Sequence, residues 1–390
     1  MYQISTLNQI SVKGLDRFSR EQFEVASDRV NPDAILCRSA KITKNDIAPT
    51  LKAIARAGAG TDKICVNECS DLGIPVFNTP GANANSVKEL VVLALLLSSR
   101  GVIKGVQFVN ELAKTHNDPI ELTKAVEKGK KQFAGTEIKG KTLGVVGLGA
   151  IGSLVADIAL HMGMEVLGYD PGLSIDTAWK LSNKIKKMEN LPTLLCNSDF
   201  VTLHLPMLES TKYMINSESL AFFKKGAKLM NFSREGIVDP NAVREALDSG
   251  NLGRFVCDFP FHVLIEHPDV ITMPHIGAST SEAEENCAVM ASEQLIDFLI
   301  NGNIKNSVNF PNLYLERNGG QRITFTNRNI PNMLNQVLAL LAENHINVLD
   351  MVNKSRKEVA YSIIDTEQPT PKKQIEQIAA IEGIHIVRSI

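Results

Sequence analysis

The chain has 390 residues, of which 44% are hydrophobic, enough for roughly two or three globular domains with cores of their own. Its 41 basic and 43 acidic residues nearly balance, which excludes the overall basic surface typical of proteins that bind nucleic acid or anionic membranes. Six scattered cysteines indicate reduced thiols in a cytosol rather than a disulfide framework, and the pair Cys65 and Cys69 lacks the further ligands of a zinc site.

The N-terminal segment MYQISTLNQI has neither the basic nor the apolar region of a signal peptide. The longest apolar run, residues 90–97, is too short to span a bilayer. We therefore expect a cytoplasmic protein that acts on a small molecule and has neither a nucleic acid nor a membrane as its partner.

Residues 1–98 alternate short apolar runs, such as 34–40 and 74–81, with helix-like segments such as 48–58. This βα order predicts a parallel sheet. From about residue 140 to 280 the order repeats with six apolar runs that each end at Gly, Pro or a polar residue. These six runs predict a second, doubly wound parallel sheet.

Residues 281–302 predict one amphipathic helix that stops at a glycine, and a domain boundary is expected near Gly319 and Gly320. Residues 321–390 then give the order strand, helix, strand, strand, helix, strand, which predicts a βαββαβ unit with a ferredoxin-like layout. The predicted fold is α/β, with two Rossmann-like doubly wound domains and a C-terminal βαββαβ domain.

A glycine motif suggests a dinucleotide site. Gly147, Gly149 and Gly152 form G-x-G-x-x-G directly after the apolar run LGVV, and Asp170 ends the next apolar run, at about the spacing of an acidic residue that binds a ribose 2′-hydroxyl. Free N–H groups and the helix dipole stabilise the pyrophosphate there. Because Asp170 would repel the extra phosphate of NADP, NAD is the expected cofactor; the alternative is a glycine turn that binds no nucleotide.

Several further motifs carry a family resemblance. They are RAGAGTD (56–62), FNTPGANANSVKEL (77–90), GLGAIG (147–152), HLP (204–206), NFSREGIVD (231–239) and PHIGAST (274–280). With the C-terminal unit, they resemble the D-isomer-specific 2-hydroxyacid dehydrogenases. Within that family the resemblance is to the branch that uses NAD to oxidise 3-phospho-D-glycerate to 3-phosphohydroxypyruvate, the first step of L-serine biosynthesis.

The resemblance implies a domain organisation and an active site. Residues 1–98 and 281–316 would form a substrate-binding domain, residues 99–280 an NAD-binding domain inserted into it, and residues 321–390 an ACT regulatory domain. The active site would lie in the cleft between the first two. The residues expected to line the cofactor are Gly147, Gly149, Ala150, Ile151, Gly152, Asp170, His204, Leu205, Pro206, Phe232, Ser233, Asp258, Gly277 and Ala278.

Two residues are the catalytic candidates. Arg234 would hold the substrate carboxylate and polarise the C2 oxygen, because its planar fork binds carboxylates bidentately. His275 would exchange the proton on that oxygen, because imidazole titrates near neutral pH. The ordinary alternatives are a surface ion pair for Arg234 and a satisfied interior histidine for His275. His262 and His267 are interpreted as loop residues.

Arg38 and Arg56 follow apolar runs of the first domain, and two arginines suit a substrate that carries both a phosphate and a carboxylate. The resemblance implies that both contact the substrate, together with Gly58 and Asn83. The alternative for the arginines is an outward-facing position on the surface.

One position departs from the family pattern. In the family, a glutamate five residues after the strand aspartate pairs with the catalytic histidine, raising its pKa and fixing its orientation; counted from Asp258, that position holds Val263. Glu266 and His262 are the candidate substitutes. An unpaired His275 would keep a pKa near about 6.5, and we predict an enzyme slowed by roughly 10- to 1,000-fold rather than inactive.

In the C-terminal unit, Asn329 and Asn347 match asparagines that contact an effector in ACT domains, which pair across a dimer and bind serine. Asn327 stands where such a relative has a histidine, and Asn332 replaces a glycine. Serine feedback and a ligand-free dimerisation module both remain open, and a homodimer or homotetramer is expected.

Two other functions also remain open. One is the same chemistry on another D-2-hydroxy acid, such as glycerate, lactate or 2-hydroxyglutarate. The other is an NAD-sensing binding protein on this scaffold, similar to some transcriptional corepressors of the superfamily.

Overall fold

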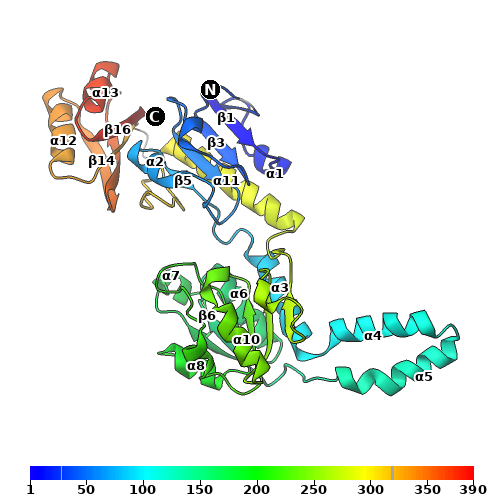
Figure 1. Cartoon of the computed structure of the whole chain (residues 1–390). Helices are drawn as coiled ribbons and strands as arrows, with labels where there is room; N and C mark the ends of the chain where they lie inside the picture. The colour runs from blue at the N-terminus through cyan, green and yellow to red at the C-terminus, as the bar shows by residue number, and fades with distance from the viewer. Residues whose placement is uncertain (28, 318–319) are drawn as a thin grey trace. The chain divides into compact units, whose positions relative to one another are not determined.

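The computed structural model describes residues 1–27, 29–317 and 320–390. The chain divides into two compact units, the first formed by Met1–Asn83 with Thr280–Ile390 and the second by Ala84–Ser279 (Figure 1). Gly319, one of the two residues at the expected domain boundary, lies outside the described residues. The segment from residue 84 to 98, which the sequence analysis placed in the substrate-binding domain, is part of the second unit.

The first unit contains a five-stranded parallel sheet in the order β2-β1-β3-β4-β5. Strand β3 (AILC) is fully buried, and β4 (AIAR) is buried except at Arg56. Helix α11 (Ser281–Asn301) packs against them through Ala291, Leu295 and Phe298. The remaining elements are β1 (Tyr2–Leu7), β2 (Phe23–Ala26), β3 (Ala34–Cys37), β4 (Ala53–Arg56), β5 (Val76–Phe77), α1 (Val12–Leu15), η1 (Lys44–Asp46) and α2 (Val66–Asp71).

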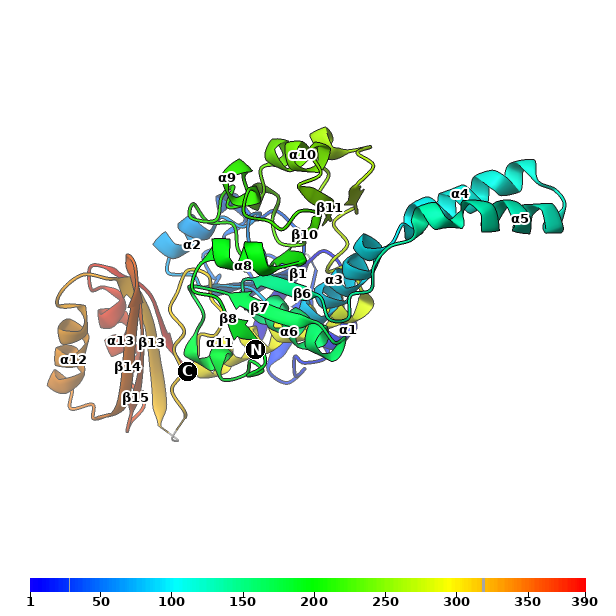
Figure 2. The same ribbon diagram turned by 90° about the horizontal axis from the view of Figure 1, so that it is seen from below.

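The C-terminal part of this unit is a four-stranded antiparallel sheet in the order β14-β15-β13-β16. Two helices cover one face of it (Figure 2) and bury Ile323, Phe325 and Ile364 against Val337 and Leu341. The predicted βαββαβ order is confirmed. The elements are β13 (Gln321–Arg328), α12 (Met333–Glu343), β14 (Val348–Arg356), β15 (Val359–Thr366), α13 (Lys372–Ala379) and β16 (Ile384–Ser389).

The other face of this antiparallel sheet packs on α11. Tyr361 and Ile363 of β15 join the apolar cluster that contains Phe298 and Phe310. At the end of α11, backbone carbonyls accept hydrogen bonds from side chains, and the carbonyl of Phe298 also accepts one from Gly302 N at 2.9 Å. The bonds run from Arg388 to Phe298 (3.1 Å) and Leu299 (2.6 Å), from Arg317 to Ile300 (3.0 Å), from Arg322 to Asn301 (2.8 Å) and from Tyr361 to Gly302 (2.6 Å).

Arg322 also forms a buried ion pair. Its Nε and Nη2 donate to the two carboxylate oxygens of Asp365 at 2.6 and 2.7 Å, and the two residues are 0% and 2% exposed. A bidentate pair of this kind satisfies both charges without water. It joins neighbouring strands of the C-terminal sheet, and Arg322 extends the connection to α11.

The second unit is a seven-stranded parallel sheet in the order β12-β11-β10-β9-β6-β7-β8. This order, with β6 in an interior position and the chain running outward on both sides, confirms the predicted doubly wound fold. The strands are β6 (Thr142–Val146), β7 (Glu165–Tyr169), β8 (Lys186–Lys187), β9 (Phe200–Leu203), β10 (Ala227–Asn231), β11 (Leu252–Cys257) and β12 (Val270–Thr272).

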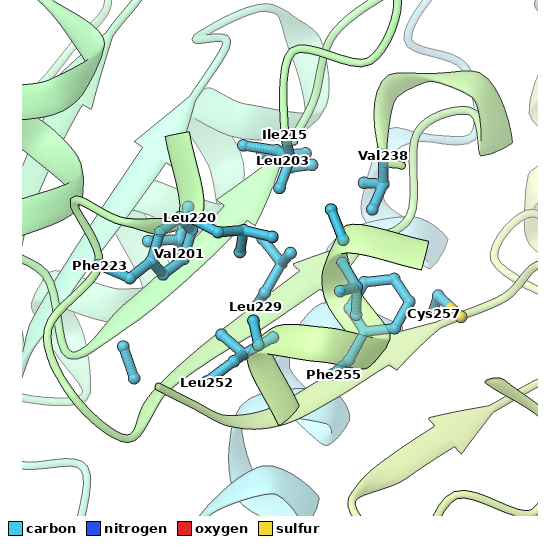
Figure 3. Packing of buried hydrophobic residues seen from close by; sticks show 14 of the residues in the cluster. Val201, Leu203, Ile215, Leu220, Phe223, Leu229, Val238, Leu252, Phe255 and Cys257 are labelled. Atoms are coloured by element: carbon cyan, nitrogen blue, oxygen red, sulfur yellow. The ribbon is translucent and has the colours of Figure 1, made fainter. Parts of the chain in front are cut away.

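Successive residues of these strands point to opposite faces, and each face has its own apolar cluster. Leu229 belongs to the cluster shown in Figure 3, whereas its neighbour Met230 belongs to the cluster on the other face. We call the first of these, which includes Val201 and Phe255, the β9–β11 cluster. The helices of the unit's body are α3 (Ala84–Ser99), α6 (Ala150–His161), α7 (Ile175–Ala178), α8 (Leu191–Asn197), α9 (Ser217–Leu220) and α10 (Pro240–Asp248), with η3 (Glu235–Ile237) and η4 (His262–Leu264).

A helical arm projects from the second unit. Helices α4 (Val102–Thr115) and α5 (Pro119–Gly129) lie side by side and away from the sheet in both views (Figures 1 and 2), followed by η2 (Lys130–Phe133). Neither helix has a buried residue. Apolar side chains are exposed on it, namely Val102, Ile103, Val106, Val109 and Ile120. Over the described residues, no helix has the length and apolar character needed to cross a membrane.

Candidate active site

The glycine loop follows β6 and is shaped by its own neighbours. Gly147 has φ +89°, and a Cβ there would lie 2.4 Å from the carbonyl oxygen of His204; a Cβ on Gly152 would lie 1.9 Å from the oxygen of Gly147. Gly149, in contrast, has no atom within 4 Å of where a Cβ would be, and no side chain caps the start of α6. The open space over Gly149 and the free N–H groups fit a pyrophosphate.

Asp170 follows β7 and supports this loop directly. Its Oδ2 accepts a hydrogen bond from Leu148 N at 2.8 Å, and its Oδ1 accepts one from Gly172 N at 2.9 Å. The same carboxylate lines a pocket of about 500 Å³ together with Tyr169 and Pro171, where an adenosine ribose would meet it. Asp170 therefore both shapes the loop and presents a negative charge to the ribose side of the site.

We expect replacement of Asp170 by alanine to weaken NAD binding about 10- to 100-fold, since a hydrogen bond to a charged group contributes about 1.5–3 kcal/mol. NADP should lose less affinity than NAD, because the charge that repels its extra phosphate is also gone. Fluorescence titration with NADH and NADPH measures both affinities. An unchanged ratio of the two affinities would contradict the role given to Asp170.

Residues after β9 and β10 are joined by hydrogen bonds. Ser233, which is buried, donates from Oγ to Leu203 O and accepts from Leu205 N at 3.2 Å. His204 Nε2 lies 3.0 Å from Thr202 Oγ1, and burial lowers the pKa of His204 to about 3. The His204 ring is therefore neutral near pH 7 and serves as a wall of the site rather than as a proton carrier.

Asp258 is 2% exposed and follows β11. Burial raises the pKa of its carboxyl, while the charge of His275 and the N–H of Gly277 oppose that rise. Its Oδ1 has no hydrogen-bond partner among the described residues. A buried acceptor without a donor fits the carboxamide N–H of a nicotinamide ring.

His275 is exposed and is held by its backbone and by one ring. Its N–H donates to Asp258 O at 3.0 Å and to Met273 O at 3.1 Å, and its φ of +32° is unusual for a side chain of this size. The ring of Phe259 packs edge-on against the imidazole, with centroids 4.9 Å apart. The ring nitrogens form no ion pair with a carboxylate within the part of the chain that the structure describes.

Arg234 begins the turn before η3. Asn231 fixes its backbone by donating from Nδ2 to Arg234 O at 2.9 Å, and Arg234 Nη1 donates to Ser233 O at 2.7 Å. The side chain is exposed. Both Arg234 and His275 lower the pKa of Asp258 through their charge, so the structure brings these three groups together.

The other predicted cofactor residues lie on the same side of this unit. Ala150 and Ile151 form the first turn of α6, and the Gly277 carbonyl accepts a hydrogen bond from Ser86 Oγ at 2.7 Å. Phe232 is buried directly after β10, whereas Pro206 and Ala278 are exposed in loops.

The position of Val263 explains why no carboxylate meets His275 there. Val263 is half-buried in η4 and packs against the β9–β11 cluster, and its carbonyl accepts from Arg244 Nη1 at 2.8 Å. Glu266 is exposed and lines a separate pocket of about 350 Å³ with Arg254. His262 is also exposed.

His267 has a structural role in the same loop. Its Nε2 lies 3.2 Å from Asp248 Oδ1, while its Nδ1 accepts from Asp269 N at 3.1 Å. Because Nδ1 accepts a hydrogen bond, these contacts place a proton on Nε2, which faces Asp248.

The first unit carries its own set of predicted residues. Arg38 and Arg56 lie at the carboxyl ends of β3 and β4, and Arg56 Nε donates to Arg38 O at 2.9 Å. Gly58 accepts from Thr79 N at 3.1 Å. Asn83 is half-buried directly before α3. Side chains that could bind a phosphomonoester thus gather at one edge of this sheet.

In the C-terminal antiparallel-sheet part of the first unit, Asn329 and Asn347 are far apart. Asn329 Nδ2 donates to Lys357 O at 2.9 Å, whereas Asn347 Nδ2 donates to Glu367 Oε2 at 3.1 Å. These partners lie beyond the two ends of β15 (Val359–Thr366). At about 3.3 Å per residue, the two asparagines of one chain lie too far apart to contact the same small effector.

Sequence reasoning missed Asn231, Phe259 and Glu284. Asn231 stands in the motif NFSREGIVD with Arg234, and Phe259 directly follows Asp258. Their closeness in sequence to predicted site residues was the signal that could have found them. No comparable signal marked Glu284, which forms an ion pair with Arg38, a residue far from it in the sequence. The described residues contain no group of three His, Cys, Asp or Glu side chains placed to hold a metal.

One long match to a known protein shows the family of this chain. Residues 106–277 match the model of the D-isomer specific 2-hydroxyacid dehydrogenase NAD binding domain. The chain is also 33% identical over 350 residues to D-3-phosphoglycerate dehydrogenase of Haemophilus influenzae, covering 87% of this chain and 81% of that protein. The chain belongs to the D-isomer-specific 2-hydroxyacid dehydrogenase family. The family and the NAD cofactor predicted from the motifs are confirmed.

Two further matches agree with this family membership. D-3-phosphoglycerate dehydrogenase of Synechocystis is 39% identical over 290 residues, which cover 72% of this chain and 49% of that protein. The structure of NAD+-bound 3-phosphoglycerate dehydrogenase in Entamoeba histolytica superimposes with a TM-score of 0.61 at 25% identity, covering 80% of this chain and 99% of that one. The chain is thus an NAD-dependent 2-hydroxyacid dehydrogenase.

Proposed function

We propose that this dehydrogenase oxidises 3-phospho-D-glycerate to 3-phosphohydroxypyruvate, the first step of L-serine biosynthesis. The observation that carries the proposal is the pair Arg38 and Arg56 at adjacent strand ends, because a 2-hydroxy acid without a second anion needs no such pair. The names of the curated relatives support the same substrate. The parallel-sheet part of the first unit would bind the substrate, and the second unit the cofactor.

Each residue has a role that follows from its chemistry. Arg234 would bind the substrate carboxylate and polarise the C2 oxygen, while His275 takes the proton from the C2 hydroxyl. NAD, when bound, accepts the hydride from C2. The charges of Asp258 and His275 attract each other, and the Phe259 ring packs edge-on against the imidazole. Gly58 and Asn83 would add contacts to the substrate.

One observation favours a second candidate. The His275 ring forms no ion pair with a carboxylate among the described residues, so it lacks the glutamate that pairs with the catalytic histidine in the family pattern. An NAD-sensing protein with weak or no turnover would tolerate this arrangement. Another D-2-hydroxy acid as substrate is the third possibility, and the two arginines of the first unit argue against a substrate with an uncharged tail.

The deciding experiment is NADH oxidation with 3-phosphohydroxypyruvate between about pH 5.5 and about pH 9, which brackets the reference pKa of histidine. Reduction uses a proton that the imidazole of His275 would supply, so the rate of the natural protein should fall toward the alkaline end of this range. A carboxylate placed beside His275 would raise its pKa and move this fall to higher pH.

Two variants test the carboxylate, Val263→Glu and His262→Glu. Since Val263 packs against the β9–β11 cluster, its replacement is expected to lower the melting temperature; exposed His262 offers the same charge without that burial. Either variant supports the account if it is faster on the alkaline side. NADH binding without consumption of any 2-oxo acid would instead establish the binding-protein candidate.

We also propose that the chain is a cytoplasmic homo-oligomer, a homodimer or homotetramer. The exposed apolar side chains of α4 and α5, on helices with no buried residue in the chain itself, suit a second copy of the same surface.

For the C-terminal unit we propose the role of an ACT domain. Because Asn329 and Asn347 lie beyond opposite ends of β15, a serine site using both would need asparagines from two copies. The alternative is a dimerisation module without ligand. Calorimetry with L-serine separates the two, since only the first releases or absorbs heat.

A further inference from the structure

The substrate edge of the first unit contains an acidic residue with no assigned role. Glu284 lies in the first turn of α11, whose N-cap Thr280 accepts a hydrogen bond from Ala283 N. The Glu284 carboxylate forms an ion pair with Arg38 Nη2. The two side chains are 41% and 43% exposed, so a ligand could reach the pair.

The second arginine is held differently. Arg56 uses Nε to donate to Arg38 O, which leaves its two terminal nitrogens for a ligand. Burial raises the pKa of Cys287, one turn after Glu284, and the charges of both arginines oppose that rise. Both guanidinium groups therefore lie beside the same turns of α11.

This arrangement has two cations and one anion before any ligand binds. A phosphomonoester carries a charge of about −1.5 to −2 near pH 7, more than the single charge of Glu284, and offers three oxygens to the guanidinium groups. A substrate tail that ends in an uncharged hydroxyl cannot compete for Arg38. Its binding would leave the ion pair of Arg38 with Glu284 unchanged.

We propose that Glu284 is a specificity-determining residue that holds Arg38 in the free enzyme and is displaced from it by the phosphate of the substrate. This role of Glu284 rests on the proposed function, and it makes the Glu284 carboxylate a competitor of the substrate phosphate for Arg38. Glu284 lowers the affinity for phosphorylated substrates and has no effect on those with neutral tails. Because it acts through Arg38, it affects KM and leaves kcat unchanged.

The test is Glu284→Gln, which keeps the shape and removes the charge. KM for 3-phosphohydroxypyruvate is expected to fall about three- to five-fold, the size of a partly exposed ion pair, with kcat and the KM for hydroxypyruvate unchanged. The fall should be larger at low ionic strength. In an Arg38→Met background the same substitution should have no effect, because its partner is absent.

Glu285→Gln is the matched control. Glu285 is the next residue of the same helical turn and pairs with Lys13 at 2.6 Å, so its substitution removes an identical charge away from Arg38. An unchanged or raised KM in Glu284→Gln overturns the proposal, as does an equal fall in Glu285→Gln. A raised KM would mean that Glu284 orients Arg38 for the substrate instead of competing with it.

Failure of the proposed function gives a different result. In that case the natural protein turns over another 2-oxo acid and ignores 3-phosphohydroxypyruvate. The role of Glu284 is then tested by calorimetric titration with inorganic phosphate, which Glu284→Gln should bind about three- to five-fold more tightly than the natural protein. Equal affinity of the two proteins for phosphate overturns the inference on that path as well.

Discussion

Replacement of His275 by asparagine should lower kcat by about 10²- to 10⁴-fold, the usual contribution of a general acid or base. Asparagine is the appropriate replacement because it tolerates positive φ, and His275 has φ +32°. The backbone bonds to Asp258 and Met273 should then survive. NADH oxidation under saturating substrate gives kcat, and fluorescence titration of NADH shows whether the cofactor site is intact.

The pH profile separates a catalytic from a structural role for His275. In the asparagine variant the fall in rate toward alkaline pH should disappear, because no imidazole remains at this position to donate the proton. His262→Asn, an exposed histidine of the same stretch, is the control and should keep the natural profile. A kcat within about ten-fold of the natural value would remove His275 from the proton transfer.

Replacement of Asp365 by alanine should destabilise the C-terminal unit by about 3–5 kcal/mol, because it leaves the Arg322 charge buried without its partner. Arg322 cannot escape to solvent, since it is fully buried and also donates to Asn301 O and Leu315 O at 2.8 and 3.0 Å. Urea unfolding, monitored by circular dichroism, measures the loss as a lower transition midpoint.

The control for this change is an exposed ion pair in the same unit. Lys372 and Glu376 lie 3.8 Å apart with 92% and 67% of their side chains exposed, and Glu376→Ala should change the stability by less than about 1 kcal/mol. Similar losses of stability in the two variants would show that burial does not make the Arg322 ion pair more important for stability than an exposed one. Substituting both Arg322 and Asp365 with apolar residues should recover part of the loss, since no unpaired charge then remains.

Local patterns in the sequence predicted much of the fold and part of the candidate site. The alternation of apolar runs and helical segments predicted both parallel sheets because burial on two faces requires continuous apolar strands. The glycine motif was equally informative, since Gly147 and Gly152 are required by contacts with their own chain. Gly302, with φ +74°, ends α11 where a helix stop was predicted.

Interactions between distant residues could not be predicted in the same way. Arg38 and Glu284 are 246 residues apart, and no local pattern joins them. The arm formed by α4 and α5 was not recognised, and neither of its helices buries a residue in the core of the unit. Val263 stands where the family pattern has a glutamate, and the contact of its side chain with the β9–β11 cluster could not be read from the sequence.

Helix α11 connects the C-terminal antiparallel sheet with the residue Arg38 of the parallel sheet, because it contacts both. It has 21 residues and is therefore about 30 Å long. Its last carbonyls are held by Arg322, Arg388 and Tyr361 of the antiparallel sheet, while Glu284 in its first turn holds Arg38. Because one helix carries both sets of contacts, we expect that a shift of the C-terminal sheet also changes how Glu284 holds Arg38.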